Sequence, residues 1–193
     1  ICASNSLDEY IIRDMLMQGA KVDSFGVGER LITSSSEPVF GGVYKLVGVE
    51  DGQGHVIPKI KISENVAKIT TPCFKSAWRL FDKETDKAIA DVITLHDEAI
   101  DEEKPYVLFD PEHTWKRKTV ENFTAVPLLQ PIFKNGQCVY TPRALKAIKA
   151  YCMAQVDNLW EEVTRFENPH NYYVDLSQKL WDEKNRLLSQ QSY

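Results

Sequence analysis

The sequence has no run of about eighteen apolar residues, the length that a membrane-spanning helix requires, and no basic, hydrophobic leader of the kind that marks a signal peptide. None of its 4 cysteines forms a Cys-x-x-Cys pair and its 4 histidines are scattered, so we expect no metal site in this chain. The formal net charge of −5 disfavours bulk attraction to nucleic acid. The sequence therefore predicts a cytoplasmic protein with free thiols, with no nucleic acid and no membrane as partner.

The first 28 residues have the pattern of a strand, a helix, a second strand and a glycine loop. An apolar stretch at residues 1–3 predicts the first strand, apolar residues at helical spacing follow at 11–16, and residues 21–25 predict the second strand. Strands joined by one helix are normally parallel and buried. Because two such strands leave their edges open, and because the chain starts at Ile1 rather than at methionine, we expect further strands from a longer protein or from another chain.

The ends of the predicted helix carry recognisable signals. Ser6 followed by Glu9 fits a capping box at its start. Gly19 is placed to end it.

Beyond a polar connector at residues 33–38, the pattern changes to strands and hairpins. The strongest hairpin signal is Asn135-Gly136, and the basic run at 116–118 is expected to be a solvated loop. Thr141-Pro142 predicts the start of a long helix that Asn168-Pro169 stops. The elements expected here are strands at 43–49, 56–62, 77–81, 88–95, 123–133 and 137–140, and helices at 141–168 and 175–189.

Two small turns are candidates for binding a phosphorylated sugar. Gly26-Val27-Gly28 follows the second strand, and glycines let an anion approach main-chain N–H groups; a short helix starting near Glu29 would favour the same anion. A polar turn follows the first strand, so in a parallel pair both turns open on the carboxyl edge, where α/β proteins bind ligands. A plain structural turn remains an alternative for the glycines, and a helix N-cap for Ser6. The candidate residues are Gly26, Val27, Gly28 and Glu29 for the phosphate, and Ser4, Asn5 and Ser6 for the ribose or its phosphate.

Several blocks of sequence occur in an informative order. S-N-S-L-D-E is followed by G-A-K-V-D-S-F-G-V-G-E-R-L and then by F-G-G-V-Y-K-L-V. These blocks resemble the Ser-Asn/Gly-Asp-Leu turn, the Gly-Val-Gly-Thr-type loop and the Gly-Gly/Cys-Val-Tyr-Lys-Leu-Val strand of the nicotinate phosphoribosyltransferase family. The resemblance continues through residues 58–65, 68–72 and 168–177, and so covers nearly the whole chain.

The resemblance implies an enzyme of NAD salvage that forms nicotinate mononucleotide and pyrophosphate from nicotinate and 5-phosphoribosyl 1-pyrophosphate. ATP hydrolysis is coupled through a phosphorylated histidine, and Mg²⁺ is required. The implied fold class is α/β: residues 1–36 form the last strand–helix–strand of an incomplete type II phosphoribosyltransferase α/β barrel with the phosphate loop, and residues 37–193 a C-terminal α+β region of hairpins and two C-terminal helices. The implied partners are the two substrates, the upstream portion of the same enzyme and a second copy in a homodimer.

Two positions depart from the family pattern. Glu29 stands where threonine is frequent, so we expect its side chain to point away and its main-chain N–H alone to contribute. Ser6 stands where aspartate is frequent, which puts a carboxylate role on the ribose in doubt. No histidine matches the phosphoacceptor, and we interpret Arg79 as structural and assign no family role to Arg30 or His170. We therefore expect no catalytic residue in this chain and no activity for it alone, with ATP bound mainly by the upstream portion.

Two alternatives stay open. One is a nicotinamide-specific relative, although the Val-Tyr-Lys-Leu-Val and Asn-Pro-His blocks favour nicotinate. The other is a non-catalytic, β-rich binding module that has kept the glycine loop.

Overall fold

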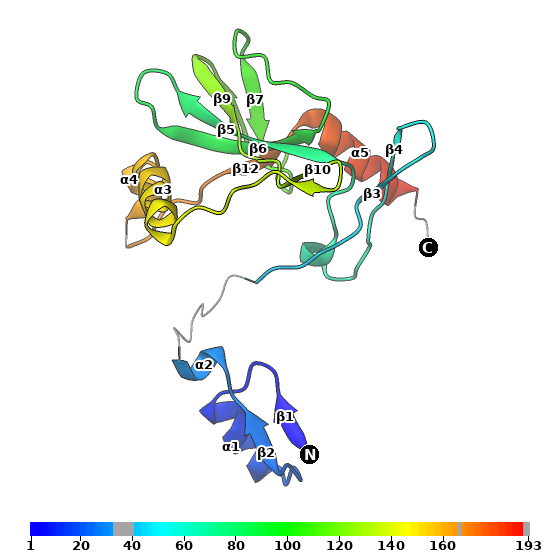
Figure 1. The fold of residues 1–193 in the computed structure, drawn as a ribbon, viewed down its shortest axis with the longest axis vertical. Helices are drawn as coiled ribbons and strands as arrows, with labels where there is room; N and C mark the ends of the chain where they lie inside the picture. The colour runs from blue at the N-terminus through cyan, green and yellow to red at the C-terminus, as the bar shows by residue number, and fades with distance from the viewer. Residues whose placement is uncertain (33–40, 166, 191–193) are drawn as a thin grey trace. The chain divides into compact units, whose positions relative to one another are not determined.

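The computed structural model describes residues 1–32, 41–165 and 167–190 (Figure 1). The chain divides into two compact units, Ile1–Lys45 and Leu46–Tyr193. The connector expected at 33–38, and with it the expected domain border at residue 36, lies outside the described residues.

The first unit has the predicted order of strand, helix and strand. It contains β1 (Cys2–Ser4), α1 (Glu9–Met17), β2 (Ser24–Gly26) and a short α2 (Glu29–Ile32). The two strands pair in parallel, as expected, but neither has a buried residue. Gly19 follows α1 with φ of +79°, a left-handed conformation that suits glycine at a helix end.

The first unit buries little of its own surface. Leu7 is the one buried side chain among the described residues 1–31. Apolar side chains such as Tyr10, Leu16 and Met17 are exposed. A pair of parallel strands normally has both faces covered, so this unit lacks the core that such strands require.

The second unit is built on a four-stranded sheet in the order β12–β6–β5–β9. Its strands are β5 (Lys75–Asp82), β6 (Ala88–Leu95), β9 (Phe123–Pro127) and β12 (Val174–Leu176). β12 runs parallel to β6, and the other pairs are antiparallel. Strand β6 alternates buried and half-buried residues, and its buried face contributes to the core cluster of Leu80, Ala90, Val92, Leu108, Val120 and Phe123.

Three hairpins accompany this sheet. They are β3 (Gly48–Glu50) with β4 (Val56–Pro58), β7 (Tyr106–Phe109) with β8 (Arg117–Val120), and β10 (Phe133–Lys134) with β11 (Gln137–Cys138). A 3₁₀ turn, η1, spans Val66–Lys68. The predicted turn at Asn135-Gly136 is confirmed, with φ of +50° and +76°, the positive values that a two-residue hairpin turn requires.

Several strand predictions were wrong in extent. The strand expected at 43–49 is limited to Gly48–Glu50, and the one expected at 56–62 stops at Pro58, which cannot donate a main-chain hydrogen bond. The strand expected at 123–133 is two separate strands, β9 and β10. The basic run at 116–118 is not a loop, because Arg117 and Lys118 belong to β8.

The helices of the second unit are α3 (Leu145–Asp157), α4 (Glu161–Thr164) and α5 (Gln178–Ser189). In Figure 1, α3 and α4 lie beside one end of the sheet and α5 beside the other. The predicted start at Thr141-Pro142 was wrong, because the cap residue of α3 is Ala144. The long helix expected at 141–168 is interrupted after Asn158, and residues 174–176, expected to be near the start of the last helix, form a strand instead.

α3 and α5 differ in how they are packed. α5 buries Leu180 completely, and its N-cap Ser177 donates a 2.6 Å hydrogen bond to Glu98 while accepting one from the main-chain N–H of Leu180 at 3.3 Å. α3 has no buried residue. No helix in the described ranges is both long and apolar enough to cross a membrane.

Candidate functional site

The two candidate turns lie at the same edge of the β1–β2 pair. In the parallel register Ser4 is opposite Gly26, so the segments that follow both residues leave the sheet at its carboxyl edge, as expected. A Cβ added at Gly26 would lie 3.3 Å from the Cβ of Ser4, a tight contact. Glycine at this position therefore lets the two strand ends approach each other.

Gly28, unlike Gly26, is not in a crowded position. A Cβ added there meets no atom of the described residues within 4 Å, and its φ is not in the left-handed region. Neither crowding nor backbone strain explains the missing side chain. The space that a side chain at Gly28 would occupy is open, which an anion-binding turn requires. α2 begins at Glu29, as predicted, although four residues are too few for a substantial helix dipole.

The polar turn after β1 has an unusual backbone. Asn5 and Ser6 have φ of +89° and +55°, in the left-handed region, which costs about 1 kcal/mol or more for a residue with a side chain. The interpretation of Ser6 as the helix cap was wrong: the cap is Asp8, whose side chain accepts the main-chain N–H of Ile11 at 2.9 Å. Helix capping therefore does not explain Ser6. The turn is exposed and its backbone is strained, so it stays a candidate for the ribose or phosphate site.

Asp8 has a second partner that the sequence pattern did not indicate. Arg30 donates to the Asp8 carboxylate at 2.9 Å, and the two side chains are 35% and 17% exposed. The pair joins the first turn of α2 to the start of α1. The two residues are 22 positions apart, so no helical or strand spacing marks them as neighbours.

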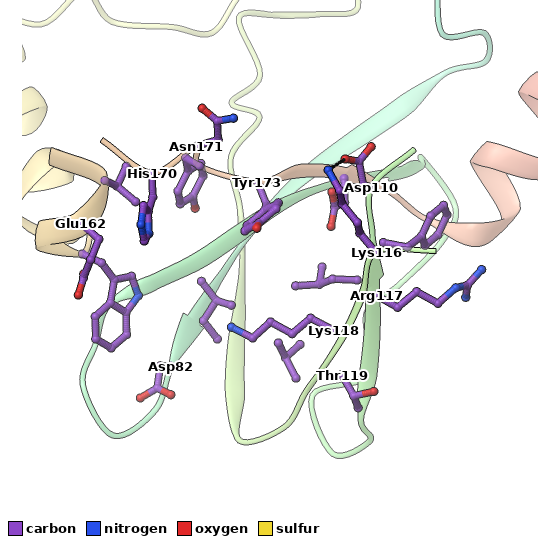
Figure 2. Close-up of a pocket in the computed structure, with 18 of the residues that line it drawn as sticks. Asp82, Asp110, Lys116, Arg117, Lys118, Thr119, Glu162, His170, Asn171 and Tyr173 are labelled. Atoms are coloured by element: carbon purple, nitrogen blue, oxygen red, sulfur yellow. Dashed lines mark ion pairs between the residues drawn. The ribbon is translucent and has the colours of Figure 1, made fainter. Parts of the chain in front are cut away.

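The second unit contains a separate groove (Figure 2). Its volume is about 700 Å³, and its walls are formed by β8, by α4 and by residues 170–173 before β12. Lys118 extends into it from β8, whereas Arg117 is directed away and lies over the ring of Phe109 at 5.2 Å. Its walls contain both carboxylates and cations, so its electrostatics select no single class of ligand.

One lining residue of the groove is a buried carboxyl group. Asp175 is 4% exposed. Burial, together with the nearby Asp110 carboxylate, raises the pKa of Asp175 to about 6, and a hydrogen bond from the main-chain N–H of Phe109 opposes the rise. Asp110 itself is stabilised by an ion pair with Lys116 at 3.8 Å, drawn in Figure 2.

Arg79 has a structural role, as predicted. Its guanidinium makes two hydrogen bonds to Asp91, at 2.8 and 2.9 Å, and a third to Gln155 of α3 at 3.1 Å. Tyr172 donates to the same Asp91 carboxylate at 2.9 Å. The hydrogen bond to Asp91 and the charge of Asp91 raise the pKa of Arg79. Burial raises the pKa of the Tyr172 hydroxyl. This network attaches α3 and the segment before β12 to the sheet.

Metal-ligating side chains are not gathered anywhere in the described parts of the chain. No group of three or more His, Cys, Asp or Glu residues there has a geometry that could hold a metal ion. Of the four cysteines, Cys73 is buried and the others are exposed, and all are free thiols.

The parallel strand pair with its intervening helix and the sheet-and-hairpin unit form an α/β arrangement. Comparison with known proteins gives the family. Residues 74–184 match the family model described as the nicotinate phosphoribosyltransferase C-terminal domain. Since this match covers more than half of the chain, the chain belongs to the nicotinate phosphoribosyltransferase family.

Similar proteins support this assignment along nearly the whole chain. Nicotinate phosphoribosyltransferase of Bacillus subtilis (strain 168) is 39% identical over 184 residues, which is 95% of this chain and 37% of that protein. The enzyme of Dictyostelium discoideum is 32% identical over 97% of this chain and 32% of its own length. The crystal structure of human nicotinic acid phosphoribosyltransferase matches with a TM-score of 0.60 and 25% identity, covering 97% of this chain and 33% of that one. The chain thus spans about a third of the length of these relatives.

Proposed function

We propose that this chain is the C-terminal part of a nicotinate phosphoribosyltransferase, which forms nicotinate mononucleotide and pyrophosphate from nicotinate and 5-phosphoribosyl 1-pyrophosphate with coupled ATP hydrolysis. In this proposal the chain supplies the ribose-5-phosphate site. The observation that carries it is the parallel register of Ser4 with Gly26, which brings the polar turn and the open glycine turn to one edge.

The proposed contacts use main-chain groups. The N–H groups of Val27, Gly28 and Glu29 donate to the 5-phosphate, and the Ser4–Ser6 turn faces the ribose or its phosphate. Gly28 leaves room for this approach because the space of its absent side chain is open. Holding the phosphate fixes the anomeric carbon relative to the base, and such positioning supplies several kcal/mol of rate enhancement in enzymes generally.

The chemistry at the anomeric carbon passes through a transition state of oxocarbenium character, by analogy with other glycosyl transfers. The groups that act on it are assigned to the upstream portion of the enzyme. Mg²⁺ binds substrate phosphates through one or two carboxylates and water, and the described residues hold no group of three candidate ligands. In this proposal Mg²⁺ and ATP are bound mainly by the substrate and the upstream portion.

The exposed surface of the first unit supports the proposal that further barrel strands cover it. Neither strand of its pair has a buried residue and Leu7 is the one buried side chain among residues 1–31, while α3 in the second unit is likewise without a buried residue. In the proposed enzyme, the upstream portion and a second copy in a homodimer supply the missing cover, and the enzyme is cytoplasmic.

A reconstitution experiment tests this function. The chain alone should be inactive, and supplying the upstream portion should restore formation of nicotinate mononucleotide and binding of ribose 5-phosphate by calorimetry. Activity with nicotinamide but not with nicotinate would support the nicotinamide-specific alternative. Tight binding of an unrelated partner by the chain alone, with no activity after reconstitution, would favour the non-catalytic module.

A further inference from the structure

The ion pair between Asp8 and Arg30 connects the elements that follow the two candidate turns. Asp8 lies two residues after the turn that leaves β1, and Arg30 two residues after the glycine turn that leaves β2. Arg30 Nη1 lies 2.9 Å from Asp8 Oδ2, while Asp8 Oδ1 accepts the main-chain N–H of Ile11 at 2.9 Å. The Asp8 carboxylate therefore caps α1 and also forms an ion pair with a residue of α2.

The short helix α2 depends on contacts with other elements for its stability. It has four residues, and helices of this length are not stable on their own in water. Its first turn continues from the glycine turn, with a hydrogen bond from the N–H of Leu31 to the carbonyl of Gly28 at 3.0 Å. Whatever sets the direction of α2 therefore also sets the direction of the N–H groups at its start. The ion pair is partly shielded from water, which makes it stronger than a pair on an open surface.

We propose that Asp8 and Arg30 are positioning residues for the phosphate turn; this inference rests on the proposed function. The pair holds the main chain of Val27 to Glu29 in the orientation that receives the 5-phosphate. In this arrangement Arg30 acts through Asp8, and the main-chain N–H groups bind the phosphate.

The chain offers substitutions that separate the ion pair from the helix cap. Asp8→Asn keeps an N-capping side chain and removes the charge, since asparagine caps helices as well as aspartate does. Arg30→Gln removes the charge on the other side, and Arg30→Lys keeps it. Arg13→Gln is the matched control, because Arg13 pairs with Asp14 on the exposed surface of α1 at 3.1 Å.

The experiment measures kcat and the two KM values in the full-length enzyme for these variants. Asp8→Asn and Arg30→Gln should each raise the KM for 5-phosphoribosyl 1-pyrophosphate by about tenfold, while the KM for nicotinate and the melting temperature stay near wild type. The double variant should be no worse than either single variant, because both remove the same interaction. Arg30→Lys and Arg13→Gln should stay within about twofold of wild type.

The outcomes distinguish this inference from the proposed function. If Gly28→Asp raises the phosphoribosyl KM but Asp8→Asn does not, the positioning role is wrong and the phosphate turn stands. A rise for Arg30→Gln alone would mean that Arg30 contacts the phosphate directly, which also overturns the proposal. If Gly28→Asp has no effect, the phosphate turn itself is wrong.

Discussion

Arg79 and Asp91 face each other across β5 and β6 and are joined by two hydrogen bonds, at 2.8 and 2.9 Å. Their side chains are only 18% and 14% exposed, so removing one partner leaves a poorly solvated charge. We expect Arg79→Met to lower the free energy of unfolding of the second unit by about 3 kcal/mol, and Asp91→Asn to have an effect of the same sign.

Urea denaturation of both single variants and the double variant measures this coupling. The double variant should lose clearly less than the sum of the two single losses, because neither charge is then left alone. Additive losses would show that the pair does not act as a unit.

Asp175 makes the stability of the protein depend on pH. Its pKa rises from the ordinary 3.8 to about 6 in the folded chain. A carboxyl group with a raised folded pKa binds its proton more tightly when folded, so its favourable contribution is full below about pH 4 and is lost as the pH rises to about 6. Asp175→Asn should therefore be more stable than wild type at pH 7, by up to about 3 kcal/mol, and nearly equal to it at pH 4.

Denaturation of wild type and Asp175→Asn at both pH values checks this prediction. Asparagine can still accept the main-chain N–H of Phe109, which makes it a suitable replacement. A variant that is less stable at pH 7 would mean that the charged carboxylate is stabilised in the fold.

Ser177 joins α5 to the loop after β6. It caps the helix and donates a short hydrogen bond to Glu98, so Ser177→Ala removes two interactions at once. We expect a loss of about 2 kcal/mol in the free energy of unfolding. Ser189→Ala, which removes a hydroxyl bonded to a main-chain carbonyl at the exposed end of α5, is the control and should change stability by less than about 0.5 kcal/mol. Equal effects of the two substitutions would contradict the role of the cap.

The cysteines report which surfaces are covered in the full-length enzyme. In the chain alone, Cys2, Cys138 and Cys152 should react with a maleimide and Cys73 should not, since it alone is buried. Cys152 lies on α3, which has no buried residue and is attached to the sheet through the hydrogen bond of Gln155 with Arg79. We therefore expect Cys152 to become protected when the upstream portion is present. Mass spectrometry of the labelled peptides measures this, and equal labelling in both forms would count against coverage of α3.

Local signals in the sequence predicted those elements that local chemistry determines. The β5–β6 hairpin forms where strands were expected at 77–81 and 88–95, with β5 longer at both ends, and Asn135-Gly136 has the positive φ values that its turn demands. The strand–helix–strand order of the first unit is also as predicted, and with it the common edge of the two turns.

Contacts between residues far apart in the sequence determine the elements that the sequence pattern predicted wrongly. Val174–Leu176 looks like the start of a helix, but it pairs in parallel with β6, a strand about eighty positions earlier, and tertiary pairing overrides local preference. Asp8 rather than Ser6 is the cap because α1 begins at Glu9, and the second carboxylate oxygen of Asp8 binds Arg30, 22 positions away. The ion pair between Asp8 and Arg30 thus has no local signal in the sequence.

The central claim is that main-chain N–H groups beside Val27 bind the 5-phosphate in the open space at Gly28. Steady-state kinetics of Gly28→Asp in the full-length enzyme test it most directly. A carboxylate in that space repels a phosphate, whereas the fold has room for the side chain. The account predicts a rise of at least about tenfold in the KM for 5-phosphoribosyl 1-pyrophosphate, with the nicotinate KM and the melting temperature unchanged. A phosphoribosyl KM equal to that of wild type would contradict it.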